Sequence, residues 1–435
     1  MTGMIFHPLQ EEAINAATDI TNKVVAVSGP AGSGKTTVLK TVYDRLRANG
    51  YNVMLVSPTG KAAKRIFEVT GIEARTIHRA LKYNHPGDPD PKTGKPMGVS
   101  VPSHTRANPI RDDDDNLVDV ILADEYAMVN NELHRNIFDA LPIGAVIRVF
   151  GDNNQLAPIE EDKRLSGQPS PFLSLLANGK HKSVVLDTVF RQGADSGILL
   201  NANNLLKSRM PTKNEQWEQK ITDQPVEALK EIIFRGEEEG FSFKETQNQI
   251  IVPQNTSWVG TRKLNTLIQG LFFNKTEPCL HVPRKDWVEG DDGKKGSTIR
   301  MFVGDKVIFT ANNYDLAIFN GETGVIIEID DDTGEIVVDF GDREQAIPPV
   351  LMVQNRHGSY SQIDPRKDLD LAYTITTHKS QGSEYKTVVY VLNKSNLYMI
   401  NRRNTYTAIT RAREMVYLIA DQRGLSQGVY KKDGN

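Results

Sequence analysis

One short glycine-rich stretch constrains this chain more than any other feature of its sequence. It fits the G-x-x-x-x-G-K-S/T pattern, starting at Gly29 and ending at Thr36. An apolar run at residues 24–27 precedes it and an amphipathic stretch at residues 37–49 follows, so the predicted order is strand, loop, helix. In that order the glycines let the backbone wrap a polyphosphate, and the helix N-terminus adds partial positive charge. The stretch therefore predicts a nucleoside triphosphate site rather than a chance glycine-rich turn.

The same stretch contains a candidate for each contact that a Mg²⁺-nucleotide needs. Lys35 can reach the β- and γ-phosphates, and the Thr36 hydroxyl can coordinate Mg²⁺. The backbone N–H groups of the loop can point at the phosphates. The expected nucleotide-binding residues are Gly29, Pro30, Ala31, Gly32, Ser33, Gly34, Lys35, Thr36 and Thr37.

Length and composition describe an ordinary globular protein. The 435 residues correspond to roughly three domains at about 150 residues each. No apolar run approaches the roughly 20 residues of a membrane-spanning helix, and residues 1–10 lack a signal-peptide pattern. The single cysteine, Cys279, excludes an intramolecular disulfide and a multi-cysteine zinc site. We therefore expect a cytoplasmic protein without a membrane partner.

The charge of the chain leaves the kind of partner open. The net charge of -3 makes the chain less basic than most nucleic-acid-binding domains. Acidic clusters such as residues 112–115 and 330–332 offset basic stretches such as residues 61–65. A local basic path is therefore compatible with the acidic total.

Buried strands alternate with helices through residue 190, which predicts a parallel sheet covered by helices. The expected elements are helices at residues 1–23, with Ile20 on the buried face, and 61–69, and strands at residues 52–56, 118–122 and 145–150. Residues 84–116 are rich in Pro, Gly, Asp and Asn, and we expect them to form an inserted hairpin.

The second half of the chain predicts another α/β domain that carries an insertion. Residues 191–240 read as mostly helical, with a polar middle that has no assignment. Further expectations are a strand at residues 248–252, a helix at 260–270 and a charged loop at 275–300. Short strands between residues 302 and 340, with Gly and Asp turns, predict a small antiparallel barrel, and strand–helix alternation returns from residue 371. The fold class is α/β.

Two acidic residues follow the predicted strand at residues 118–122. Asp124 can hold Mg²⁺, and Glu125 can act as the base on an attacking water. The structural alternative is an acidic first turn of the next helix. The phosphate loop upstream favours the catalytic interpretation.

Three further side chains are candidates for contact with the γ-phosphate. Gln155 follows the predicted strand at residues 145–150, where it can orient water or sense the γ-phosphate; its alternative is an exposed amide in a turn. Arg191 and Arg411 can neutralise transition-state charge across a domain cleft. For each arginine the alternative is a surface ion pair.

Taken in order, these motifs resemble those of superfamily 1 helicases. The series that carries the resemblance is Gln10, the phosphate loop, and residues 57–63, 76–78, 124–125, 151–155, 190–191, 378–384 and 407–413. Within the superfamily, residues 58–65 and 313–322 are most similar to the RecD-type and phage Dda-type enzymes. The series runs from residue 10 to about residue 420, which is nearly the whole chain.

The resemblance implies an ATP- and Mg²⁺-dependent motor that moves 5′ to 3′ on single-stranded DNA and unwinds at single-strand/double-strand junctions. Its implied parts are RecA-like domains at residues 1–83 with 117–190 and at 191–275 with 359–435, a strand-splitting pin at 84–116 and an SH3-like barrel at 276–358. It further implies a monomer in the cytoplasm of a bacterial or phage-infected cell, working with single-strand-binding or replication proteins.

The resemblance also assigns roles position by position. Gln10 would contact adenine and Glu384 the ribose, while Gln155, Arg191 and Arg411 would contact the γ-phosphate. The implied DNA track is Pro58, Thr59, Lys61, Thr76, His78 and His378. Candidates for base stacking, each with a core position as its alternative, are Phe67, Tyr83, Trp258, Tyr314 and Phe319.

Two departures from the family pattern keep other functions open. Tyr126-Ala127 follows the acidic pair where family members often have a small residue and then Ser. Residues 84–116 contain no Phe, Tyr or Trp, which leaves His85 and His104 as flat rings to press on a base pair. A nucleotide-gated clamp that displaces proteins but unwinds poorly is therefore the alternative. A P-loop kinase would leave the two arginines and the second half of the chain unexplained.

Overall fold

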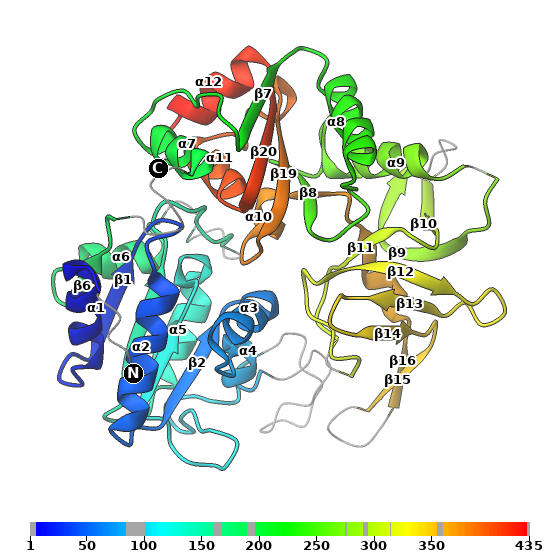
Figure 1. Cartoon of the computed structure of the whole chain (residues 1–435). Coiled ribbons are helices and arrows are strands. Elements are labelled where there is room, and N and C mark those ends of the chain that lie inside the picture. The colour runs from blue at the N-terminus through cyan, green and yellow to red at the C-terminus, as the bar shows by residue number, and fades with distance from the viewer. Residues whose placement is uncertain are drawn as a thin grey trace. The chain divides into compact units, whose positions relative to one another are not determined.

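The computed structural model describes residues 6–83, 101–160, 165, 168–188, 196–274, 276–289, 295–313, 315–354 and 360–432. The chain divides into two compact units, Met1–Leu199 with Gly434–Asn435 and Leu200–Asp433. Each unit contains a parallel sheet with helices packed on it (Figure 1). No helix in the described part of the chain is both long and apolar enough to span a membrane.

The first unit is built on a six-stranded sheet in the order β3-β2-β4-β5-β1-β6, with every neighbouring pair parallel. The strands are β1 (Val24–Ser28), β2 (Val53–Ser57), β3 (Arg75–Thr76), β4 (Val120–Ala123), β5 (Val146–Gly151) and β6 (Lys182–Val185). The predicted strands at residues 52–56, 118–122 and 145–150 are confirmed. They were recognisable because strands of a parallel sheet are buried on both faces and read as continuous apolar runs.

Helices cover both faces of this sheet (Figure 1). One face packs on α1 (Pro8–Thr18), α2 (Lys35–Ala48) and α3 (Gly60–Thr70), and the other on α4 (Ile77–Ala80), the 3₁₀ turn η1 (Tyr126–Met128), α5 (Asn131–Asp139) and α6 (Pro171–Ala177). The predicted helix at residues 1–23 is too long at its C-terminal end, and Ile20 is exposed. The reason is a turn in which the Asp19 carboxylate accepts a hydrogen bond from the Thr21 N–H, 2.9 Å away.

The predicted insertion at residues 84–116 is described from residue 101 onward. Tyr83 and Pro102 form an antiparallel bridge, and Ile110 packs in the core of the first unit. His104 is only 3% exposed, with its Nδ1 3.1 Å from the Asn108 carbonyl oxygen. A ring buried in this way does not face a base pair, so the expectation for His104 is wrong, and His85 lies outside the described residues.

The second unit contains a five-stranded parallel sheet in the order β18-β8-β19-β20-β7. Its strands are β7 (Trp217–Ile221), β8 (Asn248–Val252), β18 (Thr374–Thr376), β19 (Tyr385–Leu392) and β20 (Ala412–Ala420). The unassigned middle of residues 191–240 contains β7, between α7 (Gly197–Leu206) and α8 (Pro225–Glu239). Polar residues hide this strand in the sequence because it lies at the edge of the sheet.

Helices also pack on this second sheet. On one face, α8 and α9 (Thr261–Phe272) contribute to a core with Ile250 and Val389. On the other face, the Tyr390 hydroxyl of β19 donates to Asn404 of α11 (Arg402–Ile409) at 2.6 Å. The remaining helices are α10 (Thr377–Ser380) and α12 (Gln422–Tyr430).

The predicted barrel is present as a five-stranded antiparallel sheet in the order β14-β13-β12-β11-β17. Its strands are β11 (Lys306–Phe309), β12 (Thr323–Ile329), β13 (Ile336–Asp339), β14 (Glu344–Ile347) and β17 (Leu369–Leu371). Because β17 pairs with β11, the sheet extends beyond the predicted insertion at residues 276–358. Val307 and Phe309 share one core with Ile250 of the parallel sheet, so barrel and sheet pack as one body.

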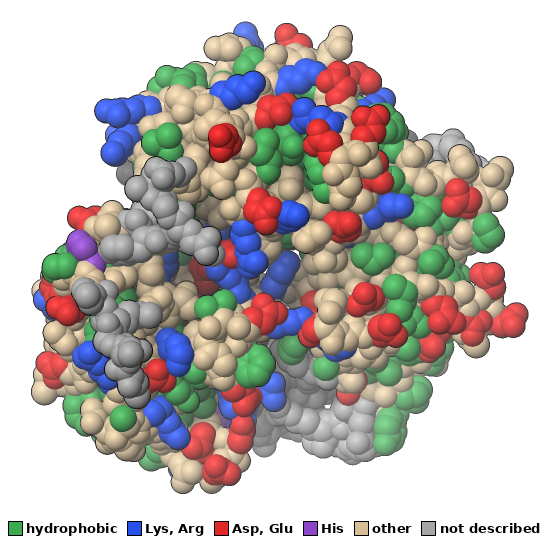
Figure 2. Space-filling model, in the orientation of Figure 1, with side chains coloured by type: hydrophobic (Ala, Val, Ile, Leu, Met, Phe, Trp, Pro, Cys, Tyr) green, Lys and Arg blue, Asp and Glu red, His purple; other side chains and the backbone are tan. Residues whose placement is uncertain are grey.

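The charged loop expected at residues 275–300 is wrong. Within it, β9 (Leu280–Glu289) and β10 (Lys295–Met301) form an antiparallel hairpin, and their many charged residues conceal the strand pattern. A second hairpin pairs β15 (Leu351–Gln354) with β16 (Tyr360–Ile363). Acidic side chains gather over the turn between β12 and β13, where residues 330–332 are exposed (Figure 2).

Candidate nucleotide-binding site

The glycine-rich loop between β1 and α2 is closely packed against the end of β5. The Gly29 N–H donates to the Gly151 carbonyl at 3.1 Å. A Cβ atom at Gly29 would lie 2.4 Å from Ser33 Oγ, so no larger residue fits there. Gly32 and Gly34 have φ angles of +81° and +79°, in the left-handed region that favours glycine. The predicted strand–loop–helix geometry is therefore present, and each of these glycines has a physical reason.

The Lys35 side chain folds back over the loop. Its Nζ donates to the carbonyl oxygens of Gly29 at 2.7 Å and Pro30 at 3.0 Å. Phosphate oxygens are stronger acceptors than these carbonyls because they are charged. The ammonium group is thus already held at the loop that would receive the phosphates.

The acidic pair lies at the carboxyl end of β4. Asp124 is buried, and its Oδ1 accepts the Glu125 N–H at 2.9 Å. Burial and the Glu125 charge raise the pKa of Asp124, and the positive charges of Lys35 and Arg65 oppose that rise. A divalent cation would favour the ionised form, and a carboxylate with the Thr36 hydroxyl is a donor set that suits Mg²⁺ with phosphates.

Several buried polar atoms around this edge have no hydrogen-bond partner within the described chain. They are Ser33 Oγ, Ser57 Oγ, Glu125 Oε2 and Gln155 Oε1. Buried polar groups are normally satisfied, so unsatisfied ones that gather in one region indicate where a ligand or water would bind. Each belongs to the carboxyl end of a strand or to the loop that follows, where open parallel sheets hold ligands.

Two side-chain contacts connect neighbouring elements to the loop. Gln10 of α1 donates from Nε2 to the Ser33 carbonyl at 3.2 Å, and its Oε1 accepts the His7 N–H at 3.1 Å. Ser28, at the end of β1, donates from Oγ to Asn153 Oδ1 at 3.1 Å. Gln10 and the segment containing Gln155 are therefore brought to the glycine-rich loop.

Of the two predicted γ-phosphate arginines, only Arg411 lies within the described residues. Arg411 is 3% exposed and donates to the carbonyl oxygens of Thr407 at 3.0 Å and Ser383 at 3.3 Å. The alternative of a surface ion pair is therefore wrong for Arg411. A surface ion pair is instead formed by Arg413, whose Nε lies 2.8 Å from Glu384 Oε2. Arg191 lies outside the described residues.

The two sheets carry the same local junction at one edge strand each. Residues 76–79 read Thr-Ile-His-Arg between β3 and α4, and residues 376–379 read Thr-Thr-His-Lys between β18 and α10. In both, the threonine Oγ1 accepts the N–H three residues on, at 3.1 Å for Thr76 and 3.3 Å for Thr376. Thr59 caps α3 in the same manner, at 3.2 Å from the Ala62 N–H. The sequence prediction missed Thr376, although the repeated Thr-x-His-Arg/Lys pattern was available to find it.

Such junctions suit nucleic-acid phosphates because free N–H groups at helix starts attract anions. Arg79 is exposed, and His78 packs on Tyr83 with ring centres 4.7 Å apart. His378 and Lys379 are half-buried, and burial lowers the pKa of both. His78 and His378 therefore line equivalent junctions, one in each unit.

The stacking candidates differ in exposure. Phe67 and Trp258 are each 55% exposed and can receive a base. Tyr83 packs against the first core, and its hydroxyl accepts a hydrogen bond from Asn136 at 2.7 Å, which favours a structural role. Phe319 is half-buried, and Tyr314 lies outside the described residues.

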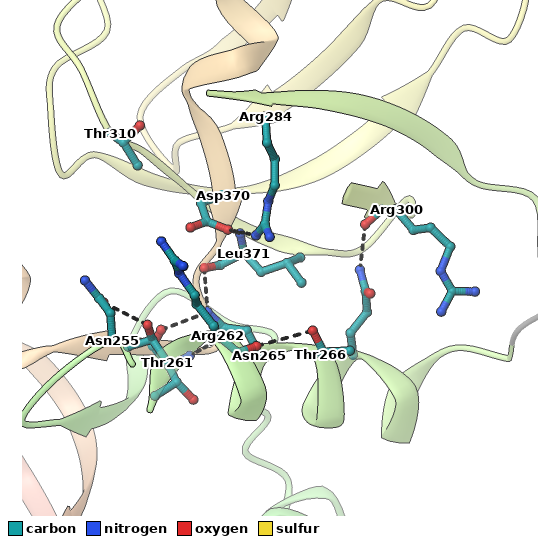
Figure 3. Close-up of polar contacts among 12 residues, drawn as sticks. Asn255, Thr261, Arg262, Asn265, Thr266, Arg284, Arg300, Thr310, Asp370 and Leu371 are labelled. Carbon is teal, nitrogen blue, oxygen red and sulfur yellow. Dashed lines mark hydrogen bonds and ion pairs between the residues drawn. The ribbon is translucent and has the colours of Figure 1, made fainter. Parts of the chain in front are cut away.

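A cluster of cations in the second unit was not predicted (Figure 3). Arg284 of β9 pairs with Asp370 of β17 at 2.7 Å, and Arg262 lies in the first turn of α9. Burial is the main cause that lowers the pKa of Lys379; the Asp370 charge opposes this effect and the Arg262 charge adds to it. Neither Arg262 nor Arg284 lies near a motif, so sequence analysis had no signal for them.

Three parts of the chain match known protein families. Residues 6–220 match a family described as AAA domain. Residues 264–340 match the SH3 domain of ATP-dependent RecD-like DNA helicases, and residues 371–419 match the UvrD-like helicase C-terminal domain.

Two relatives align with nearly the whole chain. It is 28% identical over 396 residues to the ATP-dependent RecD2 DNA helicase of Deinococcus radiodurans, covering 91% of this chain and 47% of that protein. It is 23% identical over 483 residues to the RecBCD enzyme subunit RecD of Buchnera aphidicola subsp. Schizaphis graminum, covering 98% and 74%. The chain thus spans about half the length of the RecD2 protein.

Solved structures of Pif1 helicases have a similar fold. The Bacteroides Pif1 helicase in complex with ADP-AlF3 and ssDNA aligns with a TM-score of 0.60 at 20% identity, covering 99% of this chain and 95% of that chain. Pif1 from Candida albicans aligns with a TM-score of 0.54 at 17% identity, covering 99% and 97%. The two parallel sheets thus have the RecA-like helicase fold. The family matches and the relatives make the chain similar to RecD-type helicases over nearly its whole length.

Proposed function

We propose that this chain is an ATP-dependent DNA helicase that moves 5′ to 3′ on single-stranded DNA and unwinds junctions. The observation that carries the proposal is the repeated Thr-x-His-Arg/Lys junction, one in each unit, in a chain whose first unit has a candidate nucleotide site. A motor that steps along DNA needs an ATP-binding site and two separate DNA-binding sites. This chain offers a candidate for each.

ATP would bind with its phosphates in the glycine-rich loop. Lys35 would bind the β- and γ-phosphates, while Thr36 and Asp124 would hold Mg²⁺. Bound Mg²⁺ would neutralise charge on the phosphates. Glu125 would take a proton from the attacking water, since its buried Oε2 has no partner within the described chain. Gln155 would sense the γ-phosphate.

The remaining nucleotide contacts rest on the family resemblance. Gln10 would contact adenine and Glu384 the ribose. Arg191 and Arg411 would stabilise charge on the γ-phosphate, which would make hydrolysis depend on both units. The same resemblance is the basis for the 5′ to 3′ direction, for the monomeric state and for single-strand-binding or replication proteins as partners.

Each unit would grip the DNA backbone through its own threonine-capped helix start. In the first unit, Thr59 and Thr76 would accompany Pro58, Lys61 and His78. In the second unit, Thr376, His378 and Lys379 would do so with Arg262 nearby. Phosphate contacts of this kind, with bases stacked on Phe67 and Trp258, suit single strands of any sequence.

The test uses two partial duplexes, one with a 5′ single-stranded tail and one with a 3′ tail. Strand release is followed with ATP and Mg²⁺ for the unaltered protein, Lys35→Ala and Lys40→Ala. Lys40 lies on the same helix but pairs with Asp44 at the surface, 3.0 Å away, and is the matched control. We expect release only from the 5′-tailed duplex, abolished by Lys35→Ala and retained by Lys40→Ala. Release only from the 3′-tailed duplex would contradict the direction.

A second candidate is a DNA-stimulated ATPase that displaces proteins without strong unwinding. The buried position of His104 favours it, because this removes one of the rings available to press on a base pair. ATP hydrolysis that single-stranded DNA stimulates, with neither duplex opened, would support this candidate against the helicase.

A further inference from the structure

Tyr126 is a large residue, completely buried, that directly follows the acidic pair Asp124-Glu125. Its hydroxyl oxygen lies 2.9 Å from Nδ1 of His134 on α5. Its ring centre lies 6.4 Å from that of Phe172 on α6. Tyr126 therefore ties the turn after β4 to two helices on the same face of the first sheet.

The backbone just before Tyr126 is in an unfavourable conformation. Glu125 has a φ angle of +52° and a ψ angle of 35°, in the left-handed region, although it has a full side chain. Such conformations cost on the order of 1–3 kcal/mol and persist only where the surrounding structure enforces them. Two neighbours of Glu125 can enforce this conformation: Asp124 Oδ1, which accepts the Glu125 N–H at 2.9 Å, and the turn that follows.

That turn is packed in the core of the first unit, where Tyr126, Ala127 and Val129 are buried, and its backbone hydrogen bonds are local. The Met128 N–H donates to the Glu125 carbonyl at 3.0 Å, and the Val129 N–H donates to the Tyr126 carbonyl at 3.1 Å. These bonds close η1 on itself but do not attach it to the rest of the unit. Ala127, the other buried residue of η1, has no side-chain polar group. Among the described residues, the Tyr126–His134 contact is the side-chain hydrogen bond that attaches this turn to another element.

The partners of this bond keep their protonation states near neutral pH. Burial lowers the pKa of His134 to about 4 and raises the pKa of Tyr126, so the imidazole is neutral and the phenol keeps its proton. A neutral imidazole nitrogen can accept from the phenol. The bond is therefore a fixed neutral one and not a pH-dependent switch.

We propose that Tyr126 is a positioning residue for Glu125, and that its bond to His134 holds the catalytic carboxylate in its left-handed backbone conformation. The inference rests on the proposed function, in which Glu125 acts on the attacking water. Loss of the bond would let Glu125 relax and would displace its carboxylate from the water, while the loop that binds the phosphates would be unchanged. A displacement of about 1 Å in such a group can lower a rate as much as 100-fold.

The test compares Tyr126→Phe, His134→Leu and His134→Asn in single-strand-stimulated ATP hydrolysis well below the melting temperature. Tyr126→Phe removes only the hydroxyl, and His134→Leu removes only its partner. Asn keeps a polar atom where Nδ1 lies and is the conservative control. We expect kcat to fall about tenfold for the first two with KM for ATP within about twofold, the pattern of an interaction made in the transition state. His134→Asn should recover most of kcat.

Nucleotide affinity gives a readout that a merely structural role would not change. We expect Tyr126→Phe to bind ADP as the unaltered protein does, and to bind ADP with aluminium fluoride about tenfold more weakly. A variant that melts at lower temperature but keeps kcat and both affinities would overturn the inference. Failure of the proposed function is recognised separately, because the unaltered protein and Lys35→Ala would then bind ADP equally.

Discussion

Tyr373 donates a hydrogen bond of 2.6 Å to the carboxylate of Asp305, and this contact joins the barrel to the second parallel sheet. Tyr373 lies between β17 of the barrel and β18 of the sheet, and Asp305 directly precedes β11. The other Asp305 oxygen accepts from the Phe302 N–H at 2.8 Å and from Gln269 of α9 at 2.7 Å. One buried carboxylate thus connects α9, the barrel and the strand that leads to α10.

The first prediction concerns the stability of this connection. Tyr373→Phe removes one hydrogen bond to a buried carboxylate, and we expect the free energy of unfolding to fall by about 1.5–3 kcal/mol. The exposed Asp331→Asn, in the turn between β12 and β13, is the control and should have little effect. Urea unfolding measures both. A loss below about 0.5 kcal/mol for Tyr373→Phe would mean that the contact does not stabilise the second unit.

The second prediction concerns pH. Burial raises the pKa of Asp305 to about 6, above its usual value of 3.8. A raised folded-state pKa favours folding while the group is protonated, so its stabilising effect is full below about pH 4 and is lost as the pH rises through 6. Asn does not titrate. The stability of the unaltered protein relative to Asp305→Asn should therefore fall by about 2 kcal/mol between pH 4.5 and pH 7. A difference independent of pH would contradict the raised pKa.

The third prediction concerns Arg148, which is fully buried on β5. Its guanidinium donates to carbonyl oxygens of Ala17 at 2.6 Å, Asn22 at 2.8 Å and Asp19 at 2.9 Å, at the C-terminal end of α1. Burial lowers its pKa to about 10, so it stays charged at neutral pH. Arg148→Met should destabilise the protein by about 3–5 kcal/mol, because several buried carbonyls lose their donor at once.

Arg148→Lys should restore little of the lost stability. The ammonium group is compact and cannot donate to three carbonyl oxygens that lie around a planar guanidinium. Arg47 is the matched control: it is exposed on α2 and donates to one carbonyl, that of Tyr51, at 3.3 Å. Arg47→Met should change the free energy of unfolding by about 0.5 kcal/mol or less. Equal effects of Arg148→Met and Arg47→Met would disprove the anchoring role.

The order of strands and helices in the first unit could be predicted, because parallel strands buried on both faces leave continuous apolar runs such as β1 and β5. The nucleotide loop could be predicted because Gly29 and Lys35 belong to a sequence pattern that is specific for phosphate-binding loops between a strand and a helix. Strands of the second unit were missed where they carry polar residues, as in β7 at a sheet edge and in the β9–β10 hairpin. The spacing of apolar residues does not reveal such strands, because pairing with neighbouring strands stabilises them more than burial of their own side chains does.

Side chains that meet only through the fold could not be predicted either. Asn265 of α9 donates to the Leu371 carbonyl of β17 at 2.8 Å, and nothing in the local sequence of α9 indicates that Arg262 and Asp370 both act on Lys379. Thr376 is different, because its junction repeats the pattern at Thr76 and a comparison of the two halves would have found it. The contact between Tyr126 and His134 could not be predicted either, because His134 is an isolated histidine on an amphipathic helix.

The fourth prediction concerns Arg262 as a phosphate contact in the second unit. Arg262→Ala should weaken binding to single-stranded DNA of every sequence to a similar extent, and should reduce the slope of log affinity against log salt by about 0.7. Lys230→Ala, which removes a half-buried lysine on α8 that pairs with Glu227 at 2.9 Å, is the control and should leave the slope unchanged. Loss of affinity for some sequences only would indicate a base contact instead.

The fifth prediction separates two neighbouring arginines of the second unit. If Arg411 stabilises charge on the γ-phosphate, Arg411→Ala should lower kcat for ATP hydrolysis by about 1,000-fold or more, and Arg411→Lys should recover only part of it. Arg413→Ala should leave kcat nearly unchanged, because Arg413 is a surface residue; since it pairs with Glu384, the proposed ribose contact, any effect should be confined to KM for ATP. Since Arg411 is buried and bonded to two backbone carbonyls, a fall in kcat could reflect misfolding. Single-strand affinity without nucleotide is therefore measured for each variant, and Arg411→Ala should retain it. A variant that binds DNA normally and hydrolyses ATP at the normal rate would show that Arg411 only joins α11 to the loop at Ser383, and that the γ-phosphate contact lies elsewhere.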